Sequence, residues 1–285
     1  MSILDIALSY LACPDDGGSL EISDSKLLCK SCKTSFRIIN ENTVELIAKN
    51  SFKIVTSDTV DSYSKYYSEL RELGHPTNSK TRLWGLNSTS GFVDNLRKTI
   101  SKIVGKKIVC DIGAGVGNYS LFLAQKSDFV FHCDLDMEAL DVARQKAKKA
   151  NLKNIFFVRC DYLYLPFTSN SLPCLTCIDV LERGREHDIK LIKQITNKSK
   201  DLVVIDFHSK ERTKLNRAPD WDRRYSKKEI IEILNDFNLK LLKIEGMGYL
   251  PTIRNFPQTI FNIGNLVSKA FFPPARWLVV ACKNP

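Results

Sequence analysis

The fold of this chain is decided by residues 107–120, which read KIVCDIGAGVGNYS. The apolar run before the first glycine is typical of a buried strand, and the pattern over residues 119–126 is helical. Between them lies a glycine loop, where the backbone can turn sharply and a ligand can approach closely. Free amide groups at the start of the helix favour acceptor or anionic groups. Strand, loop and helix predict the first half of a βαβ unit, and therefore an α/β fold.

The details of the loop favour one kind of ligand. A dinucleotide site has the spacing G-x-G-x-x-G/A, whereas this loop reads G-x-G-x-G, with Asn118 in place of the third small residue. Asp111 ends the strand directly before the loop, and its carboxylate would repel a pyrophosphate and attract a cationic ligand. S-adenosylmethionine carries a sulfonium and an α-ammonium group and no phosphate, so it fits this strand end better.

Carboxylates also follow the next two predicted strands. The strand over Phe129–Cys133 leads to Asp134, at the spacing where an acidic residue accepts both ribose hydroxyls. The strand that begins at Ile155 leads to Asp161, whose carboxylate can accept from an adenine amino group, and Tyr162 can add a backbone N–H to the ring. These residues complete a predicted site for an adenosine-bearing cofactor.

Four motifs give the chain a family resemblance over about residues 105–210. They are DIGAGVGNYS (111–120), CDLDMEAL (133–140), CDYLYLPF (160–167) and CIDVLER (177–183). In this order and spacing the chain is similar to class I S-adenosylmethionine-dependent methyltransferases of the methyltransferase domain 11 type. The resemblance implies a Rossmann-like seven-stranded sheet with helices on both faces. Pro173 and Arg183 depart from the family pattern, which usually has Asp and His there.

The resemblance also assigns the cofactor to particular residues. The methionine end would lie on Asp111 and the glycine loop, the ribose on Asp134, and the adenine on Asp161 and Tyr162. The full set of expected cofactor-binding residues is Asp111, Gly113, Ala114, Gly115, Gly117, Asn118, Asp134, Leu135, Asp161, Tyr162 and Asp179.

The methyl acceptor should bind near the same edge of the sheet, because ligands of open α/β sheets bind at the carboxyl ends of the strands. If the acceptor is a hydroxyl, its proton must be removed. His208 is the first candidate for this base and His187 the second, since neutral imidazole titrates near working pH. The alternative is that each is a solvated loop or helix-cap histidine. Two further candidate acceptor contacts are Glu182 and Arg183.

Two segments are candidates to cover the site. Residues 61–70 predict an aromatic helix with Tyr63 and Tyr67 on one face, similar to the lid helix of this family, or else packed on the sheet. An apolar insertion at about 249–274 stands where the family has a short hairpin. Its stripe would make an amphipathic helix that caps a pocket, contacts a membrane surface or completes the core; its members are Ile260, Ile263, Val267 and Ala270.

The N-terminal residues predict a smaller β module with a metal site. Tetrahedral Zn²⁺ needs four ligands, and C-x-x-C turns supply two sulfurs each. Here the first turn ends in a carboxylate, which can bind through oxygen. The candidate zinc ligands are Cys13, Asp16, Cys29 and Cys32, and the alternative is a metal-free ribbon. Cys174 and Cys177 form another C-x-x-C, but they lie in a predicted strand over residues 174–180 and face opposite ways.

Residues 11–47 resemble the small zinc-ribbon family that partners and activates methyltransferases, although Asp16 stands where that family usually has Cys. A ribbon of this kind also precedes the catalytic domain in one group of large-subunit rRNA guanine methyltransferases, where it helps to hold RNA. The resemblance therefore makes RNA a candidate partner.

Length and composition agree with this organisation. With 285 residues, 44% of them hydrophobic and 26% charged, the chain is long enough for about two folded domains. We expect a zinc-ribbon-like module over 1–50, a helical lid or linker region over 51–105 and the methyltransferase domain over 106–285. The nine cysteines are an odd number and no export signal or membrane span is found, which predicts reduced thiols and a cytoplasmic location.

The charge distribution leaves three functions open. The chain carries a net charge of +10, and the excess lies in residues 211–285, whereas residues 1–50 are net acidic. The acidic module and apolar insertion favour methylation of a small-molecule or lipid- or sugar-linked acceptor at oxygen or nitrogen. The basic residues between Arg212 and Lys228 favour an RNA acceptor. A non-catalytic scaffold is the third possibility.

Overall fold

The computed structural model describes residues 2–51, 91–181, 185–211, 224–249, 264 and 266–284. The strands are β1 (Leu20–Ser23), β2 (Lys26–Cys29), β3 (Ser35–Asn40), β4 (Thr43–Glu45), β5 (Ile108–Ile112), β6 (Phe129–Asp134), β7 (Ile155–Arg159), β8 (Leu172–Cys177), β9 (Ser199–His208), β10 (Leu239–Met247) and β11 (Arg276–Lys283). The helices are α1 (Ile3–Leu8), α3 (Gly91–Val104), α4 (Ser120–Ala124), α5 (Met137–Lys149), α6 (Arg185–Lys198) and α7 (Lys227–Asp236), and η1 (Tyr162–Tyr164) is a 3-10 turn.

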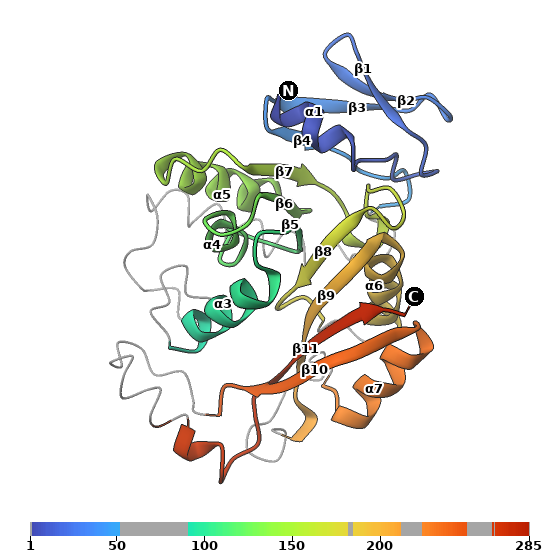
Figure 1. Ribbon diagram of the computed structural model, residues 1–285. Coiled ribbons are helices and arrows are strands. Elements are labelled where there is room, and N and C mark those ends of the chain that lie inside the picture. Colours follow the sequence, from blue (N-terminus) through green and yellow to red (C-terminus); the bar gives the residue numbers. More distant parts are fainter. Residues whose placement is uncertain are drawn as a thin grey trace.

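These strands form one mixed sheet with the order β1-β2-β3-β4-β7-β6-β5-β8-β9-β11-β10 (Figure 1). The strands from β4 to β9 in this order run parallel, and β11 is antiparallel to both β9 and β10. The strand order reverses between β5 and β8, and ligands of open α/β sheets bind in the crevice outside such a switch point. The glycine loop follows β5 and therefore lies at this crevice.

The sheet has eleven strands among the described residues, whereas we expected a seven-stranded sheet and a separate small β module. Residues 108–283 supply β5 to β11, and the N-terminal module (residues 2–51) adds β1 to β4. Strand β4 pairs with β7 in parallel, with Thr43 opposite Phe157, and the Leu46 amide donates to the Arg159 carbonyl at 2.8 Å. Without the module, β7 would be an edge strand with unpaired backbone groups, so this pairing removes an exposed edge.

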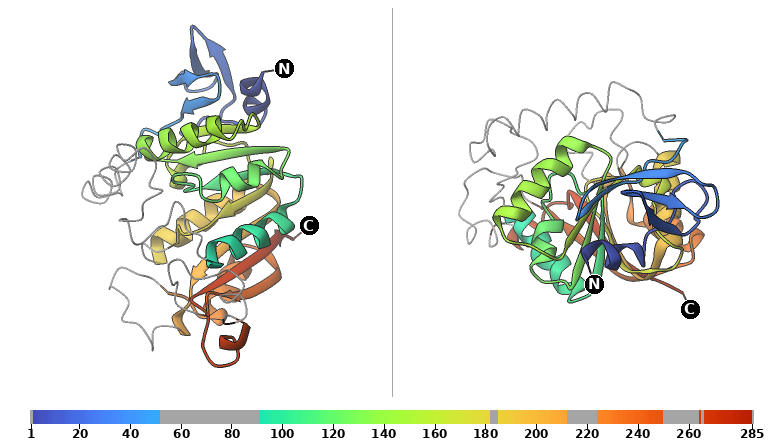
Figure 2. Two further views of the ribbon diagram at one scale, coloured as in Figure 1. Left: turned by 90° about the vertical axis from the view of Figure 1, so that its left-hand side faces the viewer. Right: turned by 90° about the horizontal axis from the view of Figure 1, so that it is seen from above.

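The module and the rest of the chain share a core. Leu11, Leu27 and Val44 of the module belong to the same buried cluster as Phe131 and Phe156 of the central strands. Figure 2 shows the module at one end of the sheet and the antiparallel pair of β10 and β11 at the other. Because the packing is continuous, the module is joined to the central sheet by side chains as well as by strand pairing.

Helices cover both faces of the sheet, because successive side chains along its buried strands point alternately into two apolar clusters, one on each face. Buried side chains of α1, α6 and α7 belong to one cluster, and those of α3, α4 and α5 to the other (Figure 1). Cys174 lies in the second cluster and Cys177 in the first. The prediction that these two thiols face opposite sides of the sheet is confirmed, and they cannot share an ion.

Two predicted segments differ from what the structure describes. Strand β8 ends at Cys177 and not at residue 180, because Asp179 has a left-handed φ of 64° that a strand cannot continue through. Of the apolar insertion, residues 250–263 and 265 lie outside the described residues, including Ile260 and Ile263. The described remainder leaves Val267 57% and Phe271 76% exposed. Among the described residues, no helix is long and apolar enough to cross a membrane.

Candidate cofactor site

The glycine loop needs its glycines for conformational reasons. Gly113, Gly115 and Gly117 have φ values of 65°, 54° and 84°, a region that other residues rarely adopt. A Cβ atom on Gly113 would lie 2.6 Å from the Val180 side chain, and one on Gly117 would lie 2.7 Å from Leu121. The loop is therefore restricted to glycine at these positions by both backbone and space.

Strand β6 holds the loop in place. The carboxylate of Asp134 accepts from the Gly115 amide at 2.7 Å and from the Asp136 amide at 2.9 Å. The Ala114 amide donates to the Cys133 carbonyl at 2.9 Å. Burial raises the pKa of Asp134 to about 6, against the opposing effect of the Asp136 and Gly115 amides. The side chain expected to hold ribose thus lies directly against the glycine loop.

Asp111 lies deeper than its expected contact with the cofactor suggests. Only 1% of its surface is exposed, and the Thr176 hydroxyl donates to its Oδ1 at 2.7 Å. Its Oδ2 has no hydrogen-bond partner among the described residues. Burial raises the pKa of Asp111 to about 7. The residue is a buried support at the base of the loop.

The predicted adenine side carries a chain of buried and partly buried polar side chains. Asp161 caps η1 by accepting from the Leu163 amide at 2.9 Å. The Tyr162 hydroxyl lies 3.1 Å from His187 Nε2, and His187 Nδ1 lies 3.7 Å from Oδ1 of the fully buried Asp188. The Tyr225 hydroxyl donates to the other oxygen of Asp188 at 2.5 Å. The fold thus brings His187, which lies on α6, beside Tyr162 in η1, 25 residues earlier in the chain.

A second polar cluster lies at the ends of β8 and β9. The Asp179 amide donates to Asp206 Oδ1 at 2.8 Å, and Arg276 Nη1 lies 2.6 Å from Asp206 Oδ2 and in contact with the Asp179 carboxylate. Burial raises the pKa of Asp179, and the Arg276 charge opposes this shift. His208 lies opposite Arg276 in the β9–β11 register. Through Arg276, the cluster connects the start of β11 to the edge of the sheet where the cofactor is expected to bind.

The remaining expected site residues divide into two groups. Asn118 and Leu135 each offer a backbone carbonyl to an arginine, at 2.7 Å from Arg97 Nε and 3.0 Å from Arg159 Nε. The other group lies outside the described residues and consists of Tyr63, Tyr67, Glu182 and Arg183.

Three residues of the site were not found from the sequence. His132 and Ser120 contact each other beneath the glycine loop, and Arg276 bridges two carboxylates. His132 interrupts the apolar run FVFHC, and Arg276 begins an apolar strand. A polar residue at such a buried position needs a partner, and this was the signal available in the sequence.

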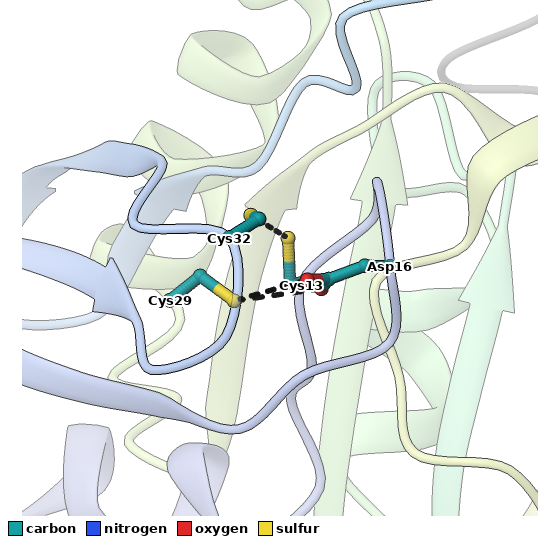
Figure 3. Close-up of side chains that lie close together, drawn as sticks. All are labelled: Cys13, Asp16, Cys29 and Cys32. Atoms are coloured by element: carbon teal, nitrogen blue, oxygen red, sulfur yellow. Dashed lines mark hydrogen bonds between the residues drawn. The ribbon is translucent and has the colours of Figure 1, made fainter.

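The four candidate metal ligands converge in the N-terminal module (Figure 3). Ligand atoms of Cys13, Asp16, Cys29 and Cys32 all lie within 4.8 Å of one another. In a tetrahedron with Zn–S bonds of ~2.3 Å, two sulfurs lie ~3.8 Å apart. The Cys13 and Cys32 sulfurs are 3.7 Å apart, and Cys29 Sγ is 3.4 Å from Asp16 Oδ1. The donor set and its spacing therefore fit a tetrahedral ion.

Comparison with known proteins agrees with the motifs. Residues 109–206 match the family described as a methyltransferase domain. The chain is similar to the ubiquinone/menaquinone biosynthesis C-methyltransferase UbiE of Cellvibrio japonicus (strain Ueda107), with 29% identity over 118 residues that cover 39% of this chain and 47% of UbiE. It is also similar to the uncharacterized RNA methyltransferase TTE1812 of Caldanaerobacter subterraneus subsp. tengcongensis, with 27% identity over 28% of this chain and 23% of that protein. The chain thus spans less than half the length of these curated relatives.

Solved structures share the fold at low sequence identity. The SAH-bound magnesium protoporphyrin IX methyltransferase ChlM from Synechocystis PCC 6803 has a TM-score of 0.57 and 17% identity, over 80% of this chain and 99% of ChlM. The [4+2]-cyclase SpnF has a TM-score of 0.58 and 15% identity, over 79% of this chain and 94% of SpnF. The chain has the α/β methyltransferase fold with an enlarged mixed sheet. The family match and this fold together support an enzyme of the S-adenosylmethionine-dependent methyltransferase class.

Proposed function

We propose that this chain transfers the methyl group of S-adenosylmethionine to a small-molecule or lipid- or sugar-linked acceptor, at oxygen or nitrogen. The observation that carries the cofactor assignment is the Asp134 carboxylate against the Gly115 amide, at 2.7 Å, where the glycine loop and β6 meet. The fold alone would be insufficient, because a cyclase shares it.

The cofactor would lie along the carboxyl ends of β5, β6 and β7. Asp134 would accept from the ribose hydroxyls with the lone pairs that its two backbone amides leave free. Asp161 would accept from the adenine amino group, and the glycine loop would carry the methionine end. The burial of Asp111 and the clash of any Cβ at Gly113 and Gly117 support a closely fitted loop.

Methyl transfer then requires an acceptor in line with the C–S bond. Bound S-adenosylmethionine would supply an electrophilic methyl group to a lone pair of the acceptor, with S-adenosylhomocysteine as the leaving group. A hydroxyl acceptor also loses its proton, and His187 is the stronger candidate base. Its Nε2 lies 3.1 Å from the Tyr162 hydroxyl, and the buried Asp188 carboxylate beside its ring would stabilise the imidazolium.

The charge and strand pairing of the N-terminal module support a small-molecule acceptor. The module is net acidic and its β4 strand is already paired with β7, whereas binding to the phosphates of RNA needs an excess of Lys and Arg. Among the similar proteins, UbiE is named as a ubiquinone/menaquinone biosynthesis C-methyltransferase and ChlM as a magnesium protoporphyrin IX methyltransferase, whereas TTE1812 is named as an RNA methyltransferase. An RNA acceptor is therefore the second candidate.

One labelling experiment separates these acceptors. The full chain and S-adenosylmethionine with a radiolabelled methyl group are added to a cell extract, which is then fractionated into RNA, organic-soluble and water-soluble material. We expect label in an organic or small-molecule fraction. Label in RNA that disappears on ribonuclease treatment would overturn the small-molecule assignment. No transfer and no binding of S-adenosylhomocysteine would favour the scaffold.

We also propose that the module binds a structural zinc ion through Cys13, Asp16, Cys29 and Cys32. A Cys₃Asp set is less usual than Cys₄ but is chemically suitable for zinc. The Gly18 amide donates to Asp16 Oδ1 at 2.8 Å and lowers the pKa of Asp16 to about 2, so this ligand is ionised. No other residue could replace Gly18 easily, because a Cβ there would lie 2.8 Å from the Cys29 sulfur.

A further inference from the structure

His132 is a fully buried titratable residue that the proposed reaction does not use. It lies on β6, two residues before Asp134, and none of its surface is exposed. Its Nδ1 lies 2.7 Å from the Ser120 hydroxyl at the start of α4, and its Nε2 lies 3.0 Å from the Gly115 carbonyl oxygen. Both ring nitrogens therefore have a partner, and one of these partners is the glycine loop.

The two contacts define the form of the ring. Burial lowers the pKa of His132 to about 3, so the imidazole is neutral at ordinary pH. A carbonyl oxygen can only accept, which assigns the hydrogen to Nε2 and leaves Nδ1 to accept from the Ser120 hydroxyl. Lys146 lies on the same side of the loop and donates to the Val116 carbonyl at 3.0 Å, and its charge also disfavours a second positive group here.

Gly115 is consequently held at both ends by one strand. Its amide donates to Asp134 and its carbonyl accepts from His132, and residues two apart on a strand face the same side. Gly115 itself has a left-handed φ of 54°, where glycine has little preference of its own. The Asp134 carboxylate, which also accepts from the Asp136 amide at 2.9 Å, therefore contacts a glycine whose carbonyl is held by His132.

We propose that His132 is a positioning residue for the cofactor site, which acts through Gly115 to orient the Asp134 carboxylate toward the ribose. This inference rests on the proposed function, because it assigns the ribose to Asp134. It predicts that affinity for the adenosine-bearing product depends on the Nε2 contact more than on the Nδ1 contact.

The test compares two amides of different length in the full chain. His132→Gln can place its amide nitrogen near the former Nε2 and still donate to Gly115, whereas His132→Asn reaches only toward Ser120. Both lose the ring and its packing on Phe157, at a centroid distance of 5.1 Å, so the loss of packing is similar. In calorimetric titration with S-adenosylhomocysteine, we expect about a tenfold weaker Kd for His132→Asn and less than about threefold for His132→Gln. Equal losses would overturn the proposal.

A double-mutant cycle tests the route through Asp134. Asp134→Asn removes the carboxylate, so His132→Asn should weaken binding little further in that background. Losses that multiply would show that His132 acts independently and would overturn the proposal.

A measurement on the unaltered protein keeps the test independent of folding. In ¹⁵N-edited spectra, His132 should be the neutral Nε2–H form, and its ring signals should shift when S-adenosylhomocysteine is added. Bound product with unmoved His132 signals would overturn the inference and leave the proposed function intact. Absence of any binding to the wild-type chain would overturn the proposed function, and this inference with it.

Discussion

At the scale of single residues, two carboxylates at neighbouring strand ends have different surroundings and different tasks. Asp134 accepts from two backbone amides beside the loop, and lone pairs remain for a ligand. Asp111 is buried beneath the loop, and the Thr176 hydroxyl donates to it. Burial raises the pKa of both residues, but only Asp134 has several amide donors that favour its charged form. We therefore expect substitutions at these two positions to affect different properties.

Asp134→Asn should weaken S-adenosylhomocysteine binding by about tenfold or more. A carboxylate has two oxygens that accept hydrogen bonds, whereas an amide has only one, so it cannot accept from Gly115 and from both ribose hydroxyls. Hydrogen bonds to a charged group contribute about 1.5–3 kcal/mol each. Calorimetric titration measures the effect. Asp141→Asn on α5, which removes an ion pair with Arg144, is the matched control and should leave the Kd unchanged. A wild-type Kd for Asp134→Asn would contradict the ribose assignment.

Asp111→Asn should stabilise the fold, by an amount that grows as pH rises. The native pKa of Asp111 is about 7, above the unfolded value of about 4, so its contribution to stability falls as pH rises from about 4 to 7. Each pKa unit corresponds to about 1.4 kcal/mol, which makes ~4 kcal/mol an upper bound for this group. Thermal unfolding at pH 5 and pH 8 should show a Tm gain over wild type that grows with pH. A Tm gain that is equal at the two pH values, or absent, would show that ionisation of the buried Asp111 carboxyl does not destabilise the fold.

At the scale of elements, α6 brings two polar residues to the cofactor edge. His187 and Asp188 lie in its first turn, and the buried Tyr225 hydroxyl, from the segment before α7, fixes Asp188. The same arrangement places His187 against Tyr162 in η1. Neither contact follows from α6 alone, since each partner comes from a different element.

His187→Gln should reduce kcat about 10²-fold or more and change the S-adenosylhomocysteine Kd less than about threefold, if the acceptor is a hydroxyl. Glutamine can bond to Tyr162 but cannot take a proton. Lys190→Gln, one turn further along α6 and paired with the exposed Glu186, serves as the control. Unchanged turnover of His187→Gln on the identified acceptor would transfer the role of base to His208 or remove the need for one.

At the scale of the whole molecule, the N-terminal module and the central sheet form one packed body. The β4–β7 pairing is supported by side chains, since Arg159 Nη1 lies 2.7 Å from Glu45 Oε2 and its Nε donates to the Leu135 carbonyl at 3.0 Å. Tyr10 of the module also packs edge-to-face on Phe131 at 5.7 Å. We therefore expect the module and the central sheet to unfold together.

Glu45→Gln should lower the free energy of unfolding by about 1 kcal/mol in a single transition. The Glu45–Arg159 pair is about three-quarters buried, so it is less screened than a surface pair. Arg37 contacts the same carboxylate at 3.4 Å from a largely exposed position, so Arg37→Gln is the matched control and should change stability by less than about 0.5 kcal/mol. Urea unfolding monitored by tryptophan fluorescence and circular dichroism measures both. Two separate transitions would contradict the single packed body.

Removal of zinc should lower the Tm of the entire chain. Cys13 and Cys29 belong to the same core cluster as the central strands, so loss of their ion should destabilise more than the module. Elemental analysis of the purified protein should give about one zinc per chain, and a strong chelator should lower the Tm. Asp16→Asn should reduce zinc retention, whereas Asp24→Asn in the β1–β2 turn should not. A chain without zinc whose Tm is unaffected by chelator would establish the metal-free ribbon.

The central strands could be predicted from the sequence to within a residue or two. The runs at β5, β6 and β7 are apolar, short and followed by a turn or a carboxylate, which is a local signal. The end of β8 was wrong because the left-handed turn at Asp179 leaves no mark in hydrophobicity. His132 and Arg276 were missed because their partners lie far away in the chain, where no local pattern points to them.

What the sequence determined by itself is the α/β class, the glycine loop and the order of carboxylates along the strand ends. These follow from local composition and spacing, since each strand, loop and helix start is encoded within a dozen residues. Only the tertiary structure decided that β4 joins β7 to make an eleven-stranded sheet, that His132 holds Gly115, and that Arg276 bridges Asp179 and Asp206. These contacts exist because a buried polar group or an open sheet edge must find a partner, and folding supplies that partner from a distant segment.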